Sequence, residues 1–128
     1  MSALKHPLPG PVNKNAVALK AFFNIASKWQ LSSEQERVLL GIPKATFYRW
    51  KSQLDGSLAA DTLERISYVL GIYKALQILL PSELAANEWL HKPNSAPLFG
   101  GKTALDKLMK GHVVDLADVR RYLDAERG

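Results

Sequence analysis

The sequence predicts an all-α fold, on three observations. Apolar residues recur at intervals of three and four along several segments, which is the spacing of one helix face. No segment shows a convincing β-strand alternation, and turn-forming glycine and proline residues mostly separate the helical segments. Hydrophobic residues make up 47% of the 128 residues, enough for a packed interior in one domain or in two small ones that share a core.

The first helix is expected to begin near Asn13. Residues 1–12 hold three prolines and a glycine and are expected to form a flexible tail. From Asn13 onward, an apolar face repeats at spacings of four, three and four, through Ala18, Phe22, Ile25 and Trp29.

A second and a third helix are expected on either side of Gly41. Ser33 and Glu36 have the spacing of a capping box, which predicts a helix start there. Gly41 suits the left-handed residue that ends such a helix. Pro43 fits the first turn of the third helix, which carries residues 44–51.

A long helix is expected from about Asp61 to Leu80, after a turn at Asp55–Gly56. Its apolar side is predicted to contain Leu63, Ile66, Leu70, Tyr73, Leu76 and Leu80. Gly71 weakens this helix by about 1 kcal/mol relative to alanine and marks a bend or a close packing contact. Pro81 ends the helix.

Three short helices and a long loop are expected after Pro81. Ser82 and Glu83 open a helix that carries Leu84, Trp89 and Leu90. Residues 91–102 form a loop that contains Leu98 and Phe99, and residues 104–110 form the next helix. Asp115 is the expected N-cap of the last helix, whose apolar stripe is Val119, Tyr122 and Leu123. Val113 and Val114 offer only a brief extended pairing.

The excess of positive over negative charge is confined to the first half of the chain. Residues 1–58 hold eight Lys/Arg against three Asp/Glu, whereas residues 59–128 hold nine of each. This distribution is expected if the first half faces phosphates, although solubility alone is an alternative explanation.

The short helix, glycine turn and second helix within residues 33–52 form a helix-turn-helix arrangement, whose second helix enters the major groove. The spacing packs Leu39, Ile42, Phe47 and Trp50 between the two helices. The predicted DNA-binding residues are those left outside: Lys44, Ala45, Thr46, Tyr48, Arg49 and Lys51. The alternative is a helix pair with no DNA role.

Residues 40–50, Leu-Gly-Ile-Pro-Lys-Ala-Thr-Phe-Tyr-Arg-Trp, resemble the phage-repressor-like (Xre) helix-turn-helix family. The resemblance covers about 50 residues. It implies that Phe47 and Trp50 are core residues and that Lys44, Ala45 and Arg49 face the bases. Some relatives have lost DNA binding, so a vestigial helix-turn-helix is a further alternative.

Phe99 and the chain end are the candidate contacts in the second half. Phe99 precedes Gly100–Gly101 and is either an exposed aromatic anchor or a plug that fills the local core against Trp89. The final helix is either presented to a partner or a frayed surface helix.

The second half resembles the Xre/MbcA/ParS toxin-binding domain over roughly residues 62–128. The match rests on Trp89–Asn94, Leu98–Gly101, Leu105–Leu108, Val119–Asp124 and Arg127–Gly128. Thr103–Ala104 departs from the proline common in relatives, a change expected at most to shift the start of the short helix and not to remove it. The resemblance implies an antitoxin of a type II toxin–antitoxin system, whose partner is a RES-domain toxin that consumes NAD or uses it to modify a protein. The implied toxin-binding residues are Phe99, Tyr122, Glu126, Arg127 and Gly128.

An enzyme is not expected. The chain has no cysteine, its three histidines lack the spacing of a zinc site, and no phosphate-binding glycine loop is present. We therefore expect no cofactor and no metal, and a cytoplasmic protein with no membrane span.

The expected domains are residues 13–75, for operator DNA binding and dimerisation, and residues 76–128, for toxin binding. A homodimer is expected because two-fold operators match two-fold proteins, with the long helix as the candidate interface. The alternative function is a plain transcriptional regulator whose C-terminal half only dimerises.

Overall fold

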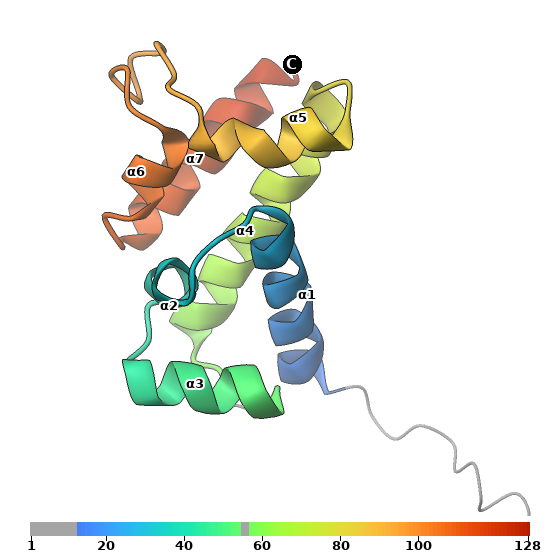
Figure 1. The fold of residues 1–128 in the computed structure, drawn as a ribbon, viewed down its shortest axis with the longest axis vertical. Helices are drawn as coiled ribbons and strands as arrows, with labels where there is room; N and C mark the ends of the chain where they lie inside the picture. Colours follow the sequence, from blue (N-terminus) through green and yellow to red (C-terminus); the bar gives the residue numbers. More distant parts are fainter. Residues whose placement is uncertain (1–12, 55–56) are drawn as a thin grey trace, which may run out of the picture.

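The computed structural model describes residues 13–54 and 57–128 and is all-helical over these ranges (Figure 1). The helices are α1 (Lys14–Lys28), α2 (Ser33–Leu40), α3 (Lys44–Gln53), α4 (Ala60–Leu79), α5 (Glu83–Glu88), the 3₁₀ helix η2 (Trp89–His91), α6 (Ala104–Leu108) and α7 (Val113–Glu126). The described residues contain no strand, only an isolated bridge between Pro93 and Thr103. The expected tail and the expected Asp55–Gly56 turn lie outside the described residues.

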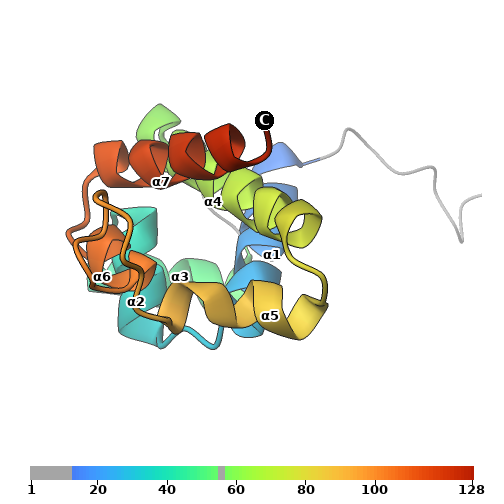
Figure 2. The same cartoon turned by 90° about the horizontal axis from the view of Figure 1, so that it is seen from above.

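Helix α4 is the spine of the molecule. It contacts α1, α2, α5 and α7. Helices α1, α2 and α3 lie toward its N-terminal end, whereas α5, α6 and α7 lie toward its C-terminal end (Figure 1). Helix α7 makes the most extensive contact with α4, and the view from above shows the two side by side (Figure 2). The domain boundary expected at residue 75 therefore falls inside one continuous helix.

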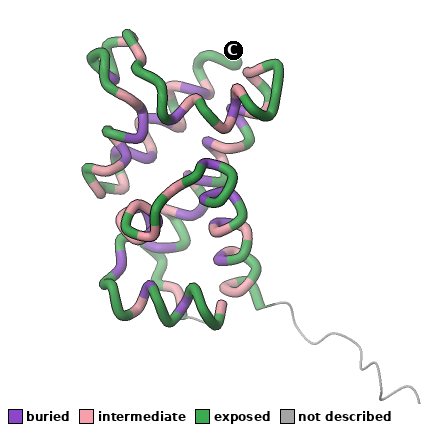
Figure 3. Tube along the Cα trace, viewed as in Figure 1, coloured by how far each residue is buried: buried purple, intermediate pink, exposed green. Residues whose placement is uncertain are grey.

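The buried residues form one core that extends through both halves of the molecule (Figure 3). Trp29, Phe22 and Phe47 are its largest fully buried side chains on the N-terminal side. The buried face of α4 contains Thr62, Ile66, Val69, Ile72, Ala75 and Leu76. Leu63 and Leu70, predicted on the apolar side, are 39% and 37% exposed. The prediction failed there because neighbours cover α4 on more than one side, and apolar periodicity does not locate them.

The N-cap of α2 lies one residue before the predicted N-cap. Ser32, not Ser33, is the N-cap: its Oγ accepts from the Gln35 amide at 3.1 Å, and the Gln35 side chain accepts from the Ser32 amide at 2.8 Å. Glu36 is instead buried. The predicted end of the helix is confirmed, because Gly41 is left-handed with φ +68°.

The N-cap of α7 lies three residues earlier than predicted. Val113 and Val114 form its first turn rather than an extended pair, and His112 is the N-cap. Asp115 lies inside the helix and is buried. Its carboxylate accepts a hydrogen bond from Lys107 at 3.1 Å, which compensates for the burial of the charge. Helix α6 starts at Ala104, with Thr103 and Asp106 forming a capping box, so the missing proline does not remove the helix.

Candidate functional site

The first candidate site is the outer face of α3, at one end of the molecule (Figure 1). Lys44, Ala45, Tyr48 and Arg49 are exposed, and Thr46 is half-buried. Phe47 and Trp50 point the other way and are buried, as predicted. Helical geometry therefore separates a solvent face with two cations and an aromatic ring from a face that packs on the rest of the protein.

Lys51 is exposed, as expected, but its ammonium group is paired within the protein. Its Nζ lies 2.7 Å from Glu36 Oε1, and it sits 5.7 Å and 5.5 Å from the ring centroids of Phe23 and Phe47. The Glu36 side chain is only 6% exposed, so its carboxylate needs a partner, and Lys51 supplies the charge. This ion pair ties α3 to α2 and explains why Glu36 is buried.

Two arginines hold the turn between α2 and α3. Arg37 Nη1 donates to the Ile42 carbonyl at 3.0 Å, and Arg37 also pairs with Glu34. The hydrogen bond from Arg37 lowers the pKa of Glu34 below its ordinary value. The Arg65 guanidinium, bonded to Asp61, lies over Gly41, where a Cβ would be 2.7 Å from it. The orientation of α3 is thus set from both sides of the turn.

The second candidate site contains an aromatic cluster near the C-terminus. Phe99 contacts Trp89 and Tyr122 edge-on, with ring centroids 5.7 Å and 5.2 Å apart, and Trp89 stacks on Tyr122 at 6.4 Å. Phe99 is only 5% exposed. Phe99 therefore fills the local core and is not an exposed anchor. Tyr122 is half-buried, so part of it remains accessible to solvent.

The chain end lies beside this cluster. Glu126, Arg127 and Gly128 are exposed on the last turn of α7, at the end of the molecule away from α3 (Figure 1). A hollow of about 250 Å³ next to them is lined by Leu79, Leu80, Trp89, Tyr122, Leu123 and Glu126. On the other side, Asp124 pairs with both Arg120 and Arg127. These two pairs have helical i,i+4 and i,i+3 spacing, a signal that the sequence contained and our site prediction omitted.

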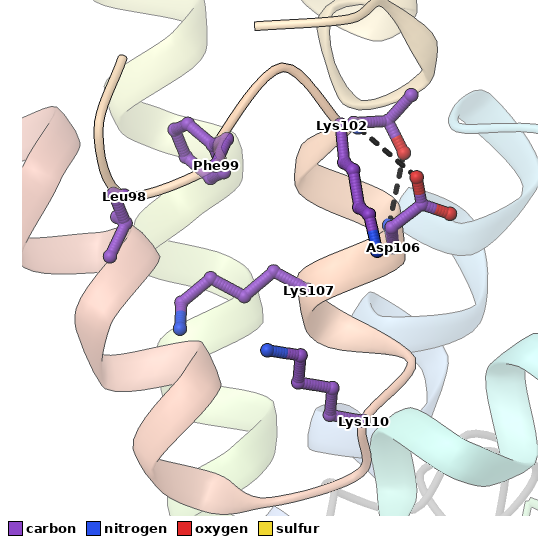
Figure 4. Close-up of a pocket in the computed structure, with 7 residues that line it drawn as sticks. Leu98, Phe99, Lys102, Asp106, Lys107 and Lys110 are labelled. Carbon is purple, nitrogen blue, oxygen red and sulfur yellow. Dashed lines mark hydrogen bonds between the residues drawn. The ribbon is translucent and has the colours of Figure 1, made fainter. Parts of the chain in front are cut away.

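A small hollow beside α6 is lined by three lysines, Lys102, Lys107 and Lys110 (Figure 4). Lys107 is not available to a ligand, because its Nζ lies 3.1 Å from Asp115 and 3.3 Å from Asp118. Hydrogen bonds from Arg121 and Lys107 hold the pKa of Asp118 below its ordinary value. These ion pairs connect α6 to α7, which is a structural role.

The described residues show no group of three His, Cys, Asp or Glu side chains placed to hold a metal ion. The same ranges contain no helix that is long and apolar enough to cross a membrane. His91, which the sequence left without a role, lies with Nε2 2.6 Å from the Trp29 carbonyl and so connects η2 to the end of α1.

Comparison with known proteins matches both halves of the chain. Residues 10–71 match the model of the antitoxin Xre-like helix-turn-helix domain, and residues 75–128 match the model of the antitoxin Xre/MbcA/ParS C-terminal toxin-binding domain. The chain is also similar to the uncharacterized protein y4oB of Sinorhizobium fredii (strain NBRC 101917 / NGR234). The two are 49% identical over 111 residues, which cover 86% of this chain and 84% of the relative.

Proposed function

Because this chain belongs to the Xre-type antitoxin family, we propose that it blocks a RES-domain toxin that consumes NAD and represses its own operon. The observation that carries the proposal is the separation of the two candidate sites. They lie at opposite ends of α4, a helix of 20 residues and therefore about 30 Å long. One molecule then has room for operator DNA and toxin at once.

Operator binding is assigned to the exposed face of α3. Lys44 and Arg49 supply the cations for phosphates or guanine edges, and Ala45 offers an apolar contact to a thymine methyl group. Lys51 contributes by holding α3 against α2 through its ion pair with Glu36 rather than by contacting DNA itself. Tyr48, which is 51% exposed, extends this face.

The operator-bound form is assigned as a homodimer, because two copies of α3 read a two-fold operator and one copy contacts few bases. The outer side of α4 is the candidate interface. Leu63 and Leu70 lie seven residues apart there, and both are more than a third exposed. Two helical turns separate them, so they form one stripe.

Toxin blocking is assigned to the last turn of α7. Arg127 and Gly128 would enter the cleft, flanked by Glu126 and the exposed part of Tyr122. A cleft that binds the pyrophosphate of NAD, or one with acidic residues, offers partners to a guanidinium. Phe99 contributes from beneath by supporting the Tyr122 ring.

Co-expression with the product of the adjacent reading frame tests the proposal. We expect a stable complex on affinity purification, and we expect cellular NAD to fall only when the antitoxin is absent. If there is neither a complex nor an effect on NAD, the toxin assignment fails and the plain transcriptional regulator takes its place.

Variants separate the two surfaces. Arg49→Ala is expected to weaken salt-dependent binding to the promoter DNA and to leave toxin capture intact, whereas deletion of Arg127 and Gly128 is expected to do the reverse. Arg121→Ala is the matched control, because it removes an exposed arginine of α7 that is in neither surface. Equal loss of both activities in Arg49→Ala contradicts the DNA assignment, and full neutralisation by the truncated chain contradicts the blocking turn. Toxin capture by wild type without any promoter binding identifies a vestigial helix-turn-helix.

A further inference from the structure

We propose that Gly71, Arg120 and Asp124 form a positioning network that orders the last turn of α7 and fixes Arg127 on it. The inference rests on the proposed function for its consequence, which is tighter toxin binding. Its structural content, the ordering of the last turn, stands independently of any toxin.

The network begins where α7 crosses α4. The Arg120 guanidinium lies directly over Gly71, and a Cβ added to Gly71 would meet Nη1 at 1.7 Å and Cζ at 2.3 Å. No residue other than glycine leaves this space free. The obstructing atoms are the end of a flexible side chain, so a substitution would displace the guanidinium rather than the α4 backbone.

Arg120 in turn holds Asp124, and Asp124 holds Arg127. Arg120 Nε donates to Asp124 Oδ2 at 3.0 Å, and Arg127 Nη1 lies 3.6 Å from Asp124 Oδ1. One carboxylate therefore uses both oxygens to connect two arginines. The three side chains and Gly128 surround an open hollow of about 380 Å³.

Burial does not hold this turn. Residues 125–128 are all exposed, and the Arg127 and Gly128 amides bond only backward, to the Leu123 and Ala125 carbonyls at 3.1 Å each. Helix ends of this kind fray unless side chains tie them down. The ion pairs through Asp124 are the contacts that anchor the turn to α4.

Order in the free protein lowers the cost of binding, because a side chain that is already held loses less freedom in the complex. Ordering one long side chain corresponds to between about twofold and about tenfold in affinity. We therefore expect Asp124→Asn to weaken toxin binding within this range.

The first test needs no toxin. Backbone ¹⁵N relaxation of the full-length protein measures the order of residues 125–128 in the wild type, Gly71→Ala and Asp124→Asn. We expect lower order in both variants, while Gly71→Ala melts no lower than the wild type because alanine favours the helix. Ser67→Ala, on the exposed side of α4, and Glu88→Gln, from another i,i+4 ion pair, are the matched controls. Unchanged order in both Gly71→Ala and Asp124→Asn overturns the network.

An added variant shows whether Gly71 acts through Arg120. Gly71→Ala is expected to cause no further loss of order in an Arg120→Ala background, because the guanidinium that it displaces is already absent. A further loss in that background contradicts the assignment of Gly71 to this network.

The second test measures toxin affinity in a double-mutant cycle between Asp124 and Arg127. The probe is the toxin recovered from the co-expressed complex and immobilised on a biosensor. We expect Asp124→Asn to weaken binding in the wild type and to have no effect in Arg127→Ala. The same loss in both backgrounds overturns positioning through Arg127. If Arg127→Ala binds like the wild type, the blocking turn of the proposed function fails instead, and the relaxation data decide the network.

Discussion

Replacing Phe99 by alanine tests whether this residue supports the C-terminal site or contacts a partner directly. The side chain is 5% exposed and contacts Trp89 and Tyr122 edge-on. Truncating a buried phenylalanine costs about 3–5 kcal/mol in the free energy of unfolding. We expect the lower end, about 3 kcal/mol, because Phe99 lies in a loop that can partly close over the cavity. At roughly 3 °C per kcal/mol for a chain of this size, the melting temperature falls by about 10 °C.

Urea unfolding followed by tryptophan fluorescence measures this change, and biosensor affinity for the toxin is measured on the folded fraction. Phe99→Leu is the matched control, because it keeps most of the apolar volume and loses only the aromatic pairs, for a cost of about 1 kcal/mol. The reasoning is refuted if Phe99→Ala abolishes toxin binding and leaves the unfolding free energy unchanged. That result would make Phe99 a direct contact.

Three further predictions concern the fold that positions the two sites. Ser32→Ala removes the capping box of α2 and should lower the unfolding free energy by about 1 kcal/mol in urea titrations. Gly41→Ala should lower it by about 1–2 kcal/mol, because alanine is strained at φ +68° and its Cβ would meet Arg65; an unchanged melting temperature would contradict this. The pKa of Asp118 is depressed in the folded state by Arg121, so its contribution to stability is present at neutral pH and is lost as pH falls through about 4 and below. Asp118→Asn should therefore flatten the acid side of the stability curve, and an unaltered curve between pH 5 and 2 would count against this ion pair.

The sequence by itself determined where most helices begin and end. Gly41 ends α2, Pro81 follows the end of α4, and Ser82 caps α5, because these residues act on backbone bonds a few positions away. It also determined the core of the helix-turn-helix, since Phe47 and Trp50 share one helix face and α3 has a single apolar side.

Only the tertiary structure decided which charged side chains form ion pairs within the protein. Lys51 lies on the exposed side as expected, but its ammonium group pairs with buried Glu36. Asp115 was expected as a cap and pairs instead with Lys107. Phe99 was a candidate contact and lies in the core. Each outcome depends on a neighbour contributed by another helix.

At Gly71 the sequence predicted the kind of feature, and the structure identified the neighbour that causes it. Its sequence position predicted a bend or a close contact, and the structure identifies the contact as the Arg120 guanidinium, 49 positions further along the chain. Local preferences act over one or two helical turns and are therefore readable from the sequence. Pairing between side chains depends on how α4 and α7 cross, and that geometry is fixed only when the whole core packs.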